Sequence, residues 1–102
     1  MFISGGENIY PTEVERALTS HDAVTEALVF GLDDEYWGNQ VTAVVVADGD
    51  VDADELDQFC KSHVSLANYK RPREYAVRSD PLPRTDTGTV ERDRVIGEHF
   101  PE

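Results

Sequence analysis

The segment SGGENIYPTEVE, residues 4–15, contains the first residues whose types suggest chemistry. Adjacent glycines permit a left-handed backbone and a very close approach to the main chain, which suits a loop that borders a ligand. Gly5 and Gly6 suit an ordinary tight turn equally well, so by themselves they leave both interpretations open. The proline and the charges that follow indicate that this loop leads into a helix.

The second candidate is YKRPR, residues 69–73, a basic and aromatic segment in an otherwise acidic chain. Tyr69 offers a flat face for a nucleobase, and Arg71 and Arg73 offer forked donors for phosphate oxygens. The alternative is that the arginines only pair with the abundant acids, and that Trp37 only packs at a strand turn. The segment therefore indicates contact with an anionic ligand, with ion pairing as the competing interpretation.

Other reactive side chains give weaker indications. Cys60 is the only cysteine, which excludes an internal disulfide, and its place on the apolar side of a predicted helix is typical of a small core residue. His21, His63 and His99 have no second ligand at metal spacing, so no metal site is predicted. The acids at 33–35 are expected to form a solvated turn, because an acid–base pair needs a pocket.

The elements that position these segments begin with a helix and a strand pair. PTEVERALTS, residues 11–20, predicts a helix in which Thr12 and Glu15 have capping-box spacing. The apolar runs at 25–32 and 40–48 predict two paired strands joined by the turn DDEYWGN.

The second half of the chain predicts a second helix, a third strand and a final helix. VDADELDQFCKSHV, residues 51–64, has its own capping pair, Asp52 and Glu55. A half-exposed strand is expected over 73–79, and a short helix over 90–100. Together these elements predict an α+β two-layer domain, in which a small, mostly antiparallel three-stranded sheet packs with helices and follows a short N-terminal extended segment.

SGGENIYPTEVE resembles the glycine-rich motif that opens the C-terminal domain of the adenylate-forming (AMP-binding) acyl-CoA synthetase superfamily. The resemblance continues through DDEYWGNQV and LANYKRPREY and ends in LPRTDTGTVER, so it covers essentially the whole chain. It implies that residues 1–102 are the mobile C-terminal domain of an acid–CoA ligase of the fatty-acid or aryl-acid type. The large N-terminal domain of such an enzyme is absent from this sequence.

The reaction that the family implies has two steps. A carboxylate attacks ATP to give an acyl-adenylate, and a thiol then displaces AMP to give an acyl-CoA thioester. ATP and CoA are the expected substrates of the full-length enzyme, with Mg²⁺ in the absent domain. The isolated domain is expected to bind no cofactor and to be inactive; its expected partners are the N-terminal domain, CoA and a small carboxylic acid.

The same resemblance assigns two sets of CoA-binding residues. The glycine loop would border the tunnel for the pantetheine arm, and a second set would contact the nucleotide end of CoA. The tunnel residues are Ser4, Gly5, Gly6 and Glu7, and the nucleotide residues are Trp37, Tyr69, Arg71 and Arg73.

One position departs from the family pattern. Thr89 stands where the family has its catalytic lysine, so no catalytic residue is assigned here, and a hydroxyl cannot supply the missing cation. Arg84 or Arg92 could substitute, although a guanidinium is bulkier and is aimed differently. Two alternatives stay open: a stand-alone, degenerate interaction or regulatory module, and an adenylation-domain lobe that serves a carrier protein.

Composition limits the partners and the setting. The chain has 21 aspartates and glutamates against 9 lysines and arginines, and this net charge of -12 repels nucleic acid and anionic membranes. No apolar run approaches a membrane span and no signal-peptide pattern is seen, so a cytoplasmic location is expected. Acids scattered over every loop resemble the surfaces of halophilic proteins.

Salt should therefore stabilise the fold, because it screens the repulsion among the acids. We expect the melting temperature to rise between dilute buffer and molar salt, by roughly 4–8 °C for each kcal/mol of repulsion that is screened. Thermal denaturation followed by circular dichroism measures this. An unchanged melting temperature would contradict the prediction.

Overall fold

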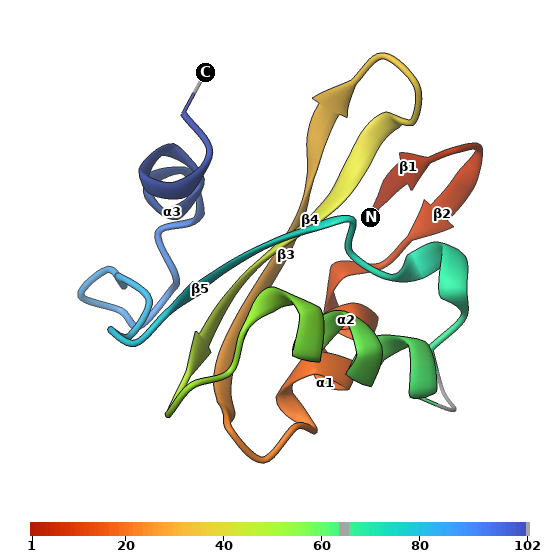
Figure 1. Ribbon diagram of the computed structural model, residues 1–102. Coiled ribbons are helices and arrows are strands. Elements are labelled where there is room, and N and C mark those ends of the chain that lie inside the picture. The colour runs from red at the N-terminus through yellow and green to blue at the C-terminus, as the bar shows by residue number, and fades with distance from the viewer. Residues whose placement is uncertain (64–65, 102) are drawn as a thin grey trace.

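The protein is described here by a computed structural model that covers residues 1–63 and 66–101 and is built around a three-stranded mixed sheet (Figure 1). The strand order is β3–β4–β5, where β3 is Val24–Asp34, β4 is Gly38–Ala47 and β5 is Glu74–Arg78. β3 and β4 are antiparallel, whereas β5 runs parallel to β4 because the chain crosses over through a helix between them. The predicted α+β class and three-stranded sheet are confirmed.

Both faces of the sheet are buried, which explains the continuous apolar runs of its two long strands. One face packs against α1 (Pro11–Thr19) and α2 (Ala53–Ser62), and the other packs against α3 (Arg92–His99). Alternate side chains of β3 and β4 supply the two cores. Val29, Val41, Ala43 and Val45 lie on the first face, and Leu28, Phe30, Val44 and Val46 lie on the second.

α1 begins in a different way from the predicted one. Its N-cap residue is Tyr10, which makes no side-chain capping bond, and Pro11 occupies the first turn, where its missing N–H costs nothing. Glu15 does not reach back to the helix start; its carboxylate accepts the backbone N–H of Val29 at 2.9 Å, on the edge strand β3. The predicted capping box of Thr12 and Glu15 is therefore wrong, because a more distant donor competes for the carboxylate.

The same contact perturbs the ionisation of Glu15. Burial raises the pKa of this carboxyl above its ordinary value, and the Val29 hydrogen bond and the charge of Arg92 offset the rise only in part. Glu15 thus links α1 to the sheet by a hydrogen bond and does not cap the helix.

α2 confirms its predicted start. The Asp52 carboxylate accepts the backbone N–H of Glu55 at 2.9 Å. Leu56 and Cys60 are buried beneath the helix, and burial raises the pKa of the Cys60 thiol, which is the environment of an inert core cysteine. Val64, the last residue of the predicted helix, lies outside the described residues.

The N-terminal segment is a hairpin rather than a single extended piece. β1 (Phe2–Ser4) and β2 (Glu7–Ile9) pair antiparallel around Gly5 and Gly6. The hairpin lies close to the central sheet, because a Cβ on Gly31 of β3 would stand only 2.9 Å from the Phe2 ring. The chain can therefore hold the glycine turn at one end of the sheet (Figure 1).

The later elements follow the prediction closely. β5 and α3 form where they were expected, and Asn68–Lys70 adds a 3-10 turn, η1, that the sequence did not indicate. Within residues 1–63 and 66–101 no helix has the length and apolar character that a bilayer crossing requires.

The two helix starts can be compared by mutation. Asp52→Ala is expected to lower the free energy of unfolding by about 0.5–2 kcal/mol, because it leaves the Glu55 N–H without its acceptor. Thr12→Ala should change it by no more than about 0.5 kcal/mol, because this exposed side chain caps nothing. Urea denaturation measures both, and equal losses would contradict the assignment.

Candidate functional site

The glycine turn of the β1–β2 hairpin presents bare main chain on one side and packs on the other. Gly5 and Gly6 are exposed and have φ values of +57° and +83°, a region that side chains disfavour. The Gly5 N–H donates to the Trp37 carbonyl at 2.8 Å, and a Cβ on Gly5 would lie 2.9 Å from Trp37 Cε3. A Cβ on Gly6 would meet nothing within 4 Å. Gly5 thus fits the domain itself, while Gly6 borders open space.

Trp37 is held by the turn between β3 and β4. The Asp34 carboxylate accepts the backbone N–H groups of Tyr36 at 2.8 Å and Trp37 at 3.0 Å, which fixes the turn. Tyr36 is 82% exposed, and its ring meets the Trp37 ring edge-on with centroids 4.9 Å apart. Of the three acids that were expected to form a solvated turn, Asp33 and Glu35 are exposed and Asp34 is half-buried.

Arg73 approaches the same tryptophan from the segment before β5. Its guanidinium Cζ lies 4.7 Å from the Trp37 ring centroid, and its backbone N–H donates to the Val41 carbonyl at 2.8 Å. Within residues 1–63 and 66–101 Arg73 forms no ion pair with a carboxylate. A cation that stays unpaired in so acidic a chain is available to an anionic ligand.

Arg71 lies in a groove of about 470 Å³ next to Arg73. Its Nε donates to Asp57 Oδ1 at 2.6 Å, so this arginine is paired with an acid of α2. Tyr69 is 47% exposed on η1, with the Lys70 ammonium 5.7 Å from its ring centroid. The remaining groove residues are Ala53, Asp54, Pro72, Glu74 and Tyr75.

The loop that carries Thr89 is an exposed turn on the far side of the domain from the hairpin (Figure 1). The Thr85 N–H donates to the Thr89 carbonyl at 2.8 Å, and Gly88 has a φ of +89°. Arg84 forms an ion pair with Glu26 on β3, which also accepts the Leu82 N–H at 3.0 Å. Arg84 is therefore engaged in anchoring the loop.

The other arginine near this loop is also engaged. The guanidinium of Arg92, at the start of α3, lies 5.9 Å from the Phe30 ring centroid. Thr89 thus places a hydroxyl where the family has its lysine. The guanidinium groups of Arg84 and Arg92 both contact side chains of the sheet.

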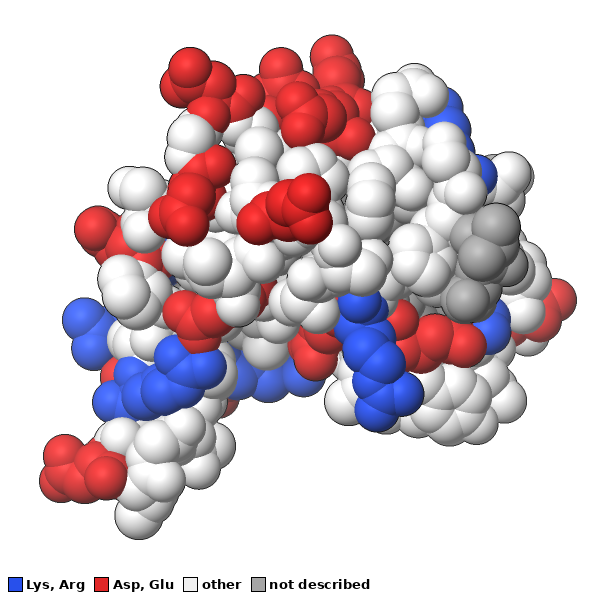
Figure 2. Space-filling view, turned by 90° about the horizontal axis from the view of Figure 1, so that it is seen from below, with Lys and Arg blue, Asp and Glu red and all other residues white. Residues whose placement is uncertain are grey.

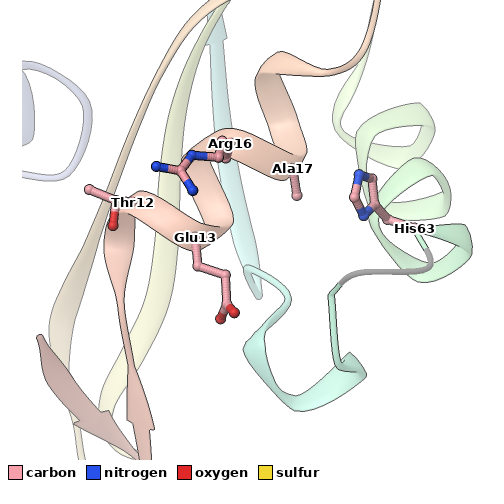
Figure 3. A pocket seen from close by; sticks show the side chains of 5 residues that line it. All are labelled: Thr12, Glu13, Arg16, Ala17 and His63. Atoms are coloured by element: carbon pink, nitrogen blue, oxygen red, sulfur yellow. The ribbon is translucent and has the colours of Figure 1, made fainter.

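A second hollow, of about 410 Å³, lies between α1 and the end of α2 (Figure 3). In Figure 3 the Arg16 guanidinium points away from His63. The Glu13 carboxylate is paired with Lys70 at 2.7 Å. These charged groups do not converge on a common point. Among the described residues no cluster of three or more His, Cys, Asp or Glu side chains could hold a metal ion.

The surface charge is unevenly distributed. Figure 2 shows acidic side chains over the upper part of one face and lysines and arginines interrupting the acids across its lower part. An anionic ligand would therefore meet attraction only locally, where arginines are exposed.

The comparisons with known proteins give the family of the chain. A family model described as the AMP-binding enzyme C-terminal domain matches residues 13–89. The chain belongs to this family.

Curated relatives of this C-terminal domain are CoA ligases. A 2-succinylbenzoate–CoA ligase of Bacillus licheniformis is 47% identical over 95 residues, which cover 93% of this chain and 19% of that ligase. A 4-chlorobenzoate–CoA ligase of Pseudomonas sp. (strain CBS-3) is 45% identical over 98 residues, covering 94% of this chain and 18% of that ligase. The domain therefore spans about a fifth of the length of these relatives.

Solved structures resemble the domain over nearly its whole length. A double mutant of o-succinylbenzoate CoA synthetase (MenE) from Bacillus subtilis, bound with a product analogue, matches 91% of this chain and 19% of its own, with a TM-score of 0.81 and 47% identity. A fatty acyl CoA synthetase of Mycobacterium tuberculosis matches 99% of this chain and 20% of its own, with a TM-score of 0.85 and 37% identity.

In this AMP-binding C-terminal domain the residues predicted to bind CoA do not all meet. Gly5, Trp37 and Arg73 lie together, and Arg71 lies in the adjacent groove. Tyr69 is exposed on η1. The hairpin pairs Ser4, which is buried, with Glu7, which is exposed.

Sequence reasoning missed two acids that shape this site, Asp34 and Asp57. Asp34 could have been found, because an aspartate two residues before the turn's aromatic pair is typical of an Asx turn. Asp57 has a local partner in Lys61 four residues on, but nothing local indicates its contact with Arg71, which is 14 residues away.

Alanine at each position of the glycine turn tests the packing of the hairpin. Both substitutions carry the cost of a left-handed backbone, about 1–2 kcal/mol. Gly5→Ala should cost a further 1–3 kcal/mol, roughly the price of overpacking, because the new methyl group meets Trp37. Chemical denaturation measures the difference, and equal destabilisation would show that Trp37 does not constrain Gly5.

Proposed function

We propose that the chain is the C-terminal lobe of an ATP-dependent acid–CoA ligase that forms an acyl-adenylate and then an acyl-CoA thioester. The support is the family match together with relatives whose names are those of CoA ligases. Identities of 47% and 45% to ligases of aromatic acids favour an aryl acid over a fatty acid as the substrate. ATP and CoA are metabolites of the cytoplasm, which is the location that we infer.

The observation that carries the proposal is the convergence of bare main chain, an indole and a guanidinium that has no carboxylate partner among the described residues, at one end of the sheet. Gly6 is open on the side away from the domain, so a thin thiol-bearing arm could pass along it. Trp37 and Arg73 stand next to this turn and offer an aromatic face and phosphate donors. These are the features that the pantetheine and nucleotide ends of CoA require.

Within this function the lobe would contribute mainly to the second step. Ser4, Gly5, Gly6 and Glu7 would border the path of the pantetheine arm. The nucleotide end would meet Trp37, Tyr69, Arg71 and Arg73. ATP, its accompanying Mg²⁺ and the carboxylic acid would be held by a larger N-terminal domain, and the lobe alone would be inactive.

The first step would lack one cation from this lobe. Thr89 provides a hydroxyl, and Arg84, which could have replaced the lysine, is paired with Glu26. These two observations favour a second candidate function, a degenerate lobe that binds or regulates a partner without supporting adenylation. A lobe that serves a carrier protein is less favoured, because Arg73 and Trp37 would then lack a nucleotide to contact.

Gly6→Leu in the full-length enzyme that carries this domain tests the proposal. We expect thioester formation from preformed acyl-adenylate to slow by roughly 10- to 100-fold, because the side chain obstructs the thiol arm. Pyrophosphate exchange, which reports adenylation, should be unchanged. Single-turnover assays measure both half-reactions separately.

The matched control is Gly49→Leu. Gly49 has almost the same backbone strain, with φ of +82° against +83°, and equally open surroundings, but it lies in the loop after β4. It should leave both half-reactions unchanged. If the two variants behave alike, or if Gly6→Leu slows both half-reactions equally, the tunnel role is wrong.

A further inference from the structure

The groove beside Arg73 contains a carboxylate to which the proposed function gives no role. Asp57 lies on α2, with 27% of its side chain exposed, and it accepts from three donors. Arg71 Nε is 2.6 Å from Oδ1, the Tyr75 hydroxyl is 3.4 Å from the same oxygen, and Lys61 Nζ is 3.4 Å from Oδ2. Asp57 therefore ties α2 both to the start of β5 and to the segment before it.

The contact with Asp57 fixes the orientation of Arg71. A guanidinium is planar, so a short hydrogen bond at Nε sets the direction of its remaining donors. Nη1 faces the Asn68 carbonyl at 3.4 Å, and within residues 1–63 and 66–101 Nη2 has no hydrogen-bond partner. Only 16% of the Arg71 side chain is exposed, and the residue lines the groove.

The charges of the groove make this orientation important. Asp54, Asp57 and Glu74 line it together with Arg71 and Arg73, so a phosphate would face three carboxylates and two guanidinium groups. Without a fixed orientation, the Arg71 guanidinium could turn its remaining donors toward the other acids of the groove. An arginine whose inner edge is already paired keeps its outer donors for another anion.

The Asp57 carboxylate stays charged in this setting. Desolvation opposes its ionisation, but the hydrogen bonds and charges of Arg71 and Lys61 outweigh that effect and hold the pKa of Asp57 below its ordinary value. The pair is therefore ionic at neutral pH and can hold Arg71 throughout the range in which a ligase works.

We propose that Asp57 is a positioning residue for CoA: it holds Arg71 so that the free Nη2 edge faces a phosphate of the nucleotide end in the groove beside Arg73. The inference rests on the proposed function, because it needs CoA in this groove. Asp57 itself does not touch the ligand. A competing role makes the opposite prediction, since an acid that merely occupies Arg71 would weaken CoA binding, and its removal would improve it.

The test uses the full-length enzyme that carries this domain, with CoA and pantetheine as alternative thiol substrates. Asp57→Ala should raise KM for CoA by roughly tenfold, the loss expected when one charge-assisted hydrogen bond is no longer aligned. KM for pantetheine, which lacks the nucleotide, and the rate of pyrophosphate exchange should not change. Asp57→Asn keeps an acceptor for Arg71 and should give a smaller rise.

A double-mutant cycle separates positioning from a general loss of stability. Asp57→Ala should add little to the KM of Arg71→Ala, because both remove the same aligned donor. Asp50→Ala, which removes an exposed acid of the loop before α2, is the matched control and should leave KM for CoA unchanged. An unchanged or lower KM for CoA in Asp57→Ala, or equal rises for CoA and pantetheine, would overturn the inference.

The same assays keep the inference distinct from the function on which it rests. If Arg73→Ala raises KM for CoA while Asp57→Ala does not, the positioning role is wrong and CoA binding at this end of the domain stands. If neither Arg73→Ala nor Arg71→Ala affects KM for CoA, the nucleotide contacts of the proposed function are wrong as well.

Discussion

The fit of Gly5 against Trp37 is the contact on which the rest of the candidate site depends. A main-chain hydrogen bond and a glycine without room for a methyl group join the N-terminal hairpin to the turn between β3 and β4. The indole that receives the hairpin also lies against Arg73, from a third segment of the chain. Three segments distant in sequence thus meet at one side chain, and the sheet beneath them has a buried core on each face to keep them in place.

Local patterns predicted the elements well and their contacts only in part. The cap at Asp52 and the strand runs were found because their signals lie within a few residues. Thr12 and Glu15 carry the same spacing, yet Glu15 bonds the N–H of Val29 instead, because the edge of β3 passes within its reach. Sequence spacing alone cannot show whether a carboxylate will accept a nearby backbone N–H or one that tertiary folding brings close. The hairpin was missed because each of its strands has only three residues, which is too short for an alternating pattern to indicate a strand, although the glycine pair did indicate a turn.

In the candidate site, too, the sequence indicated some residues and gave no indication of their tertiary contacts. Residue type and resemblance indicated Trp37, Arg71 and Arg73 as CoA contacts, and Trp37 and Arg73 do meet in space. Neither residue type nor resemblance indicated Asp57, although its carboxylate contacts the side chains of Arg71, Tyr75 and Lys61. In a chain with 21 acids, the sequence cannot tell which one will lie beneath an arginine. The distinction matters because, among the described residues, Arg71 pairs with a carboxylate while Arg73, two residues on, does not.

The indole at the centre of this site has a practical consequence. Trp37 is the only tryptophan of the chain, and it touches the two parts that would move when an arm passes the hairpin or an anion draws Arg73 away. In the isolated domain all indole emission would come from this one position. The fold therefore carries an intrinsic optical reporter at the proposed CoA-binding face, and no dye would have to be attached to follow a response there.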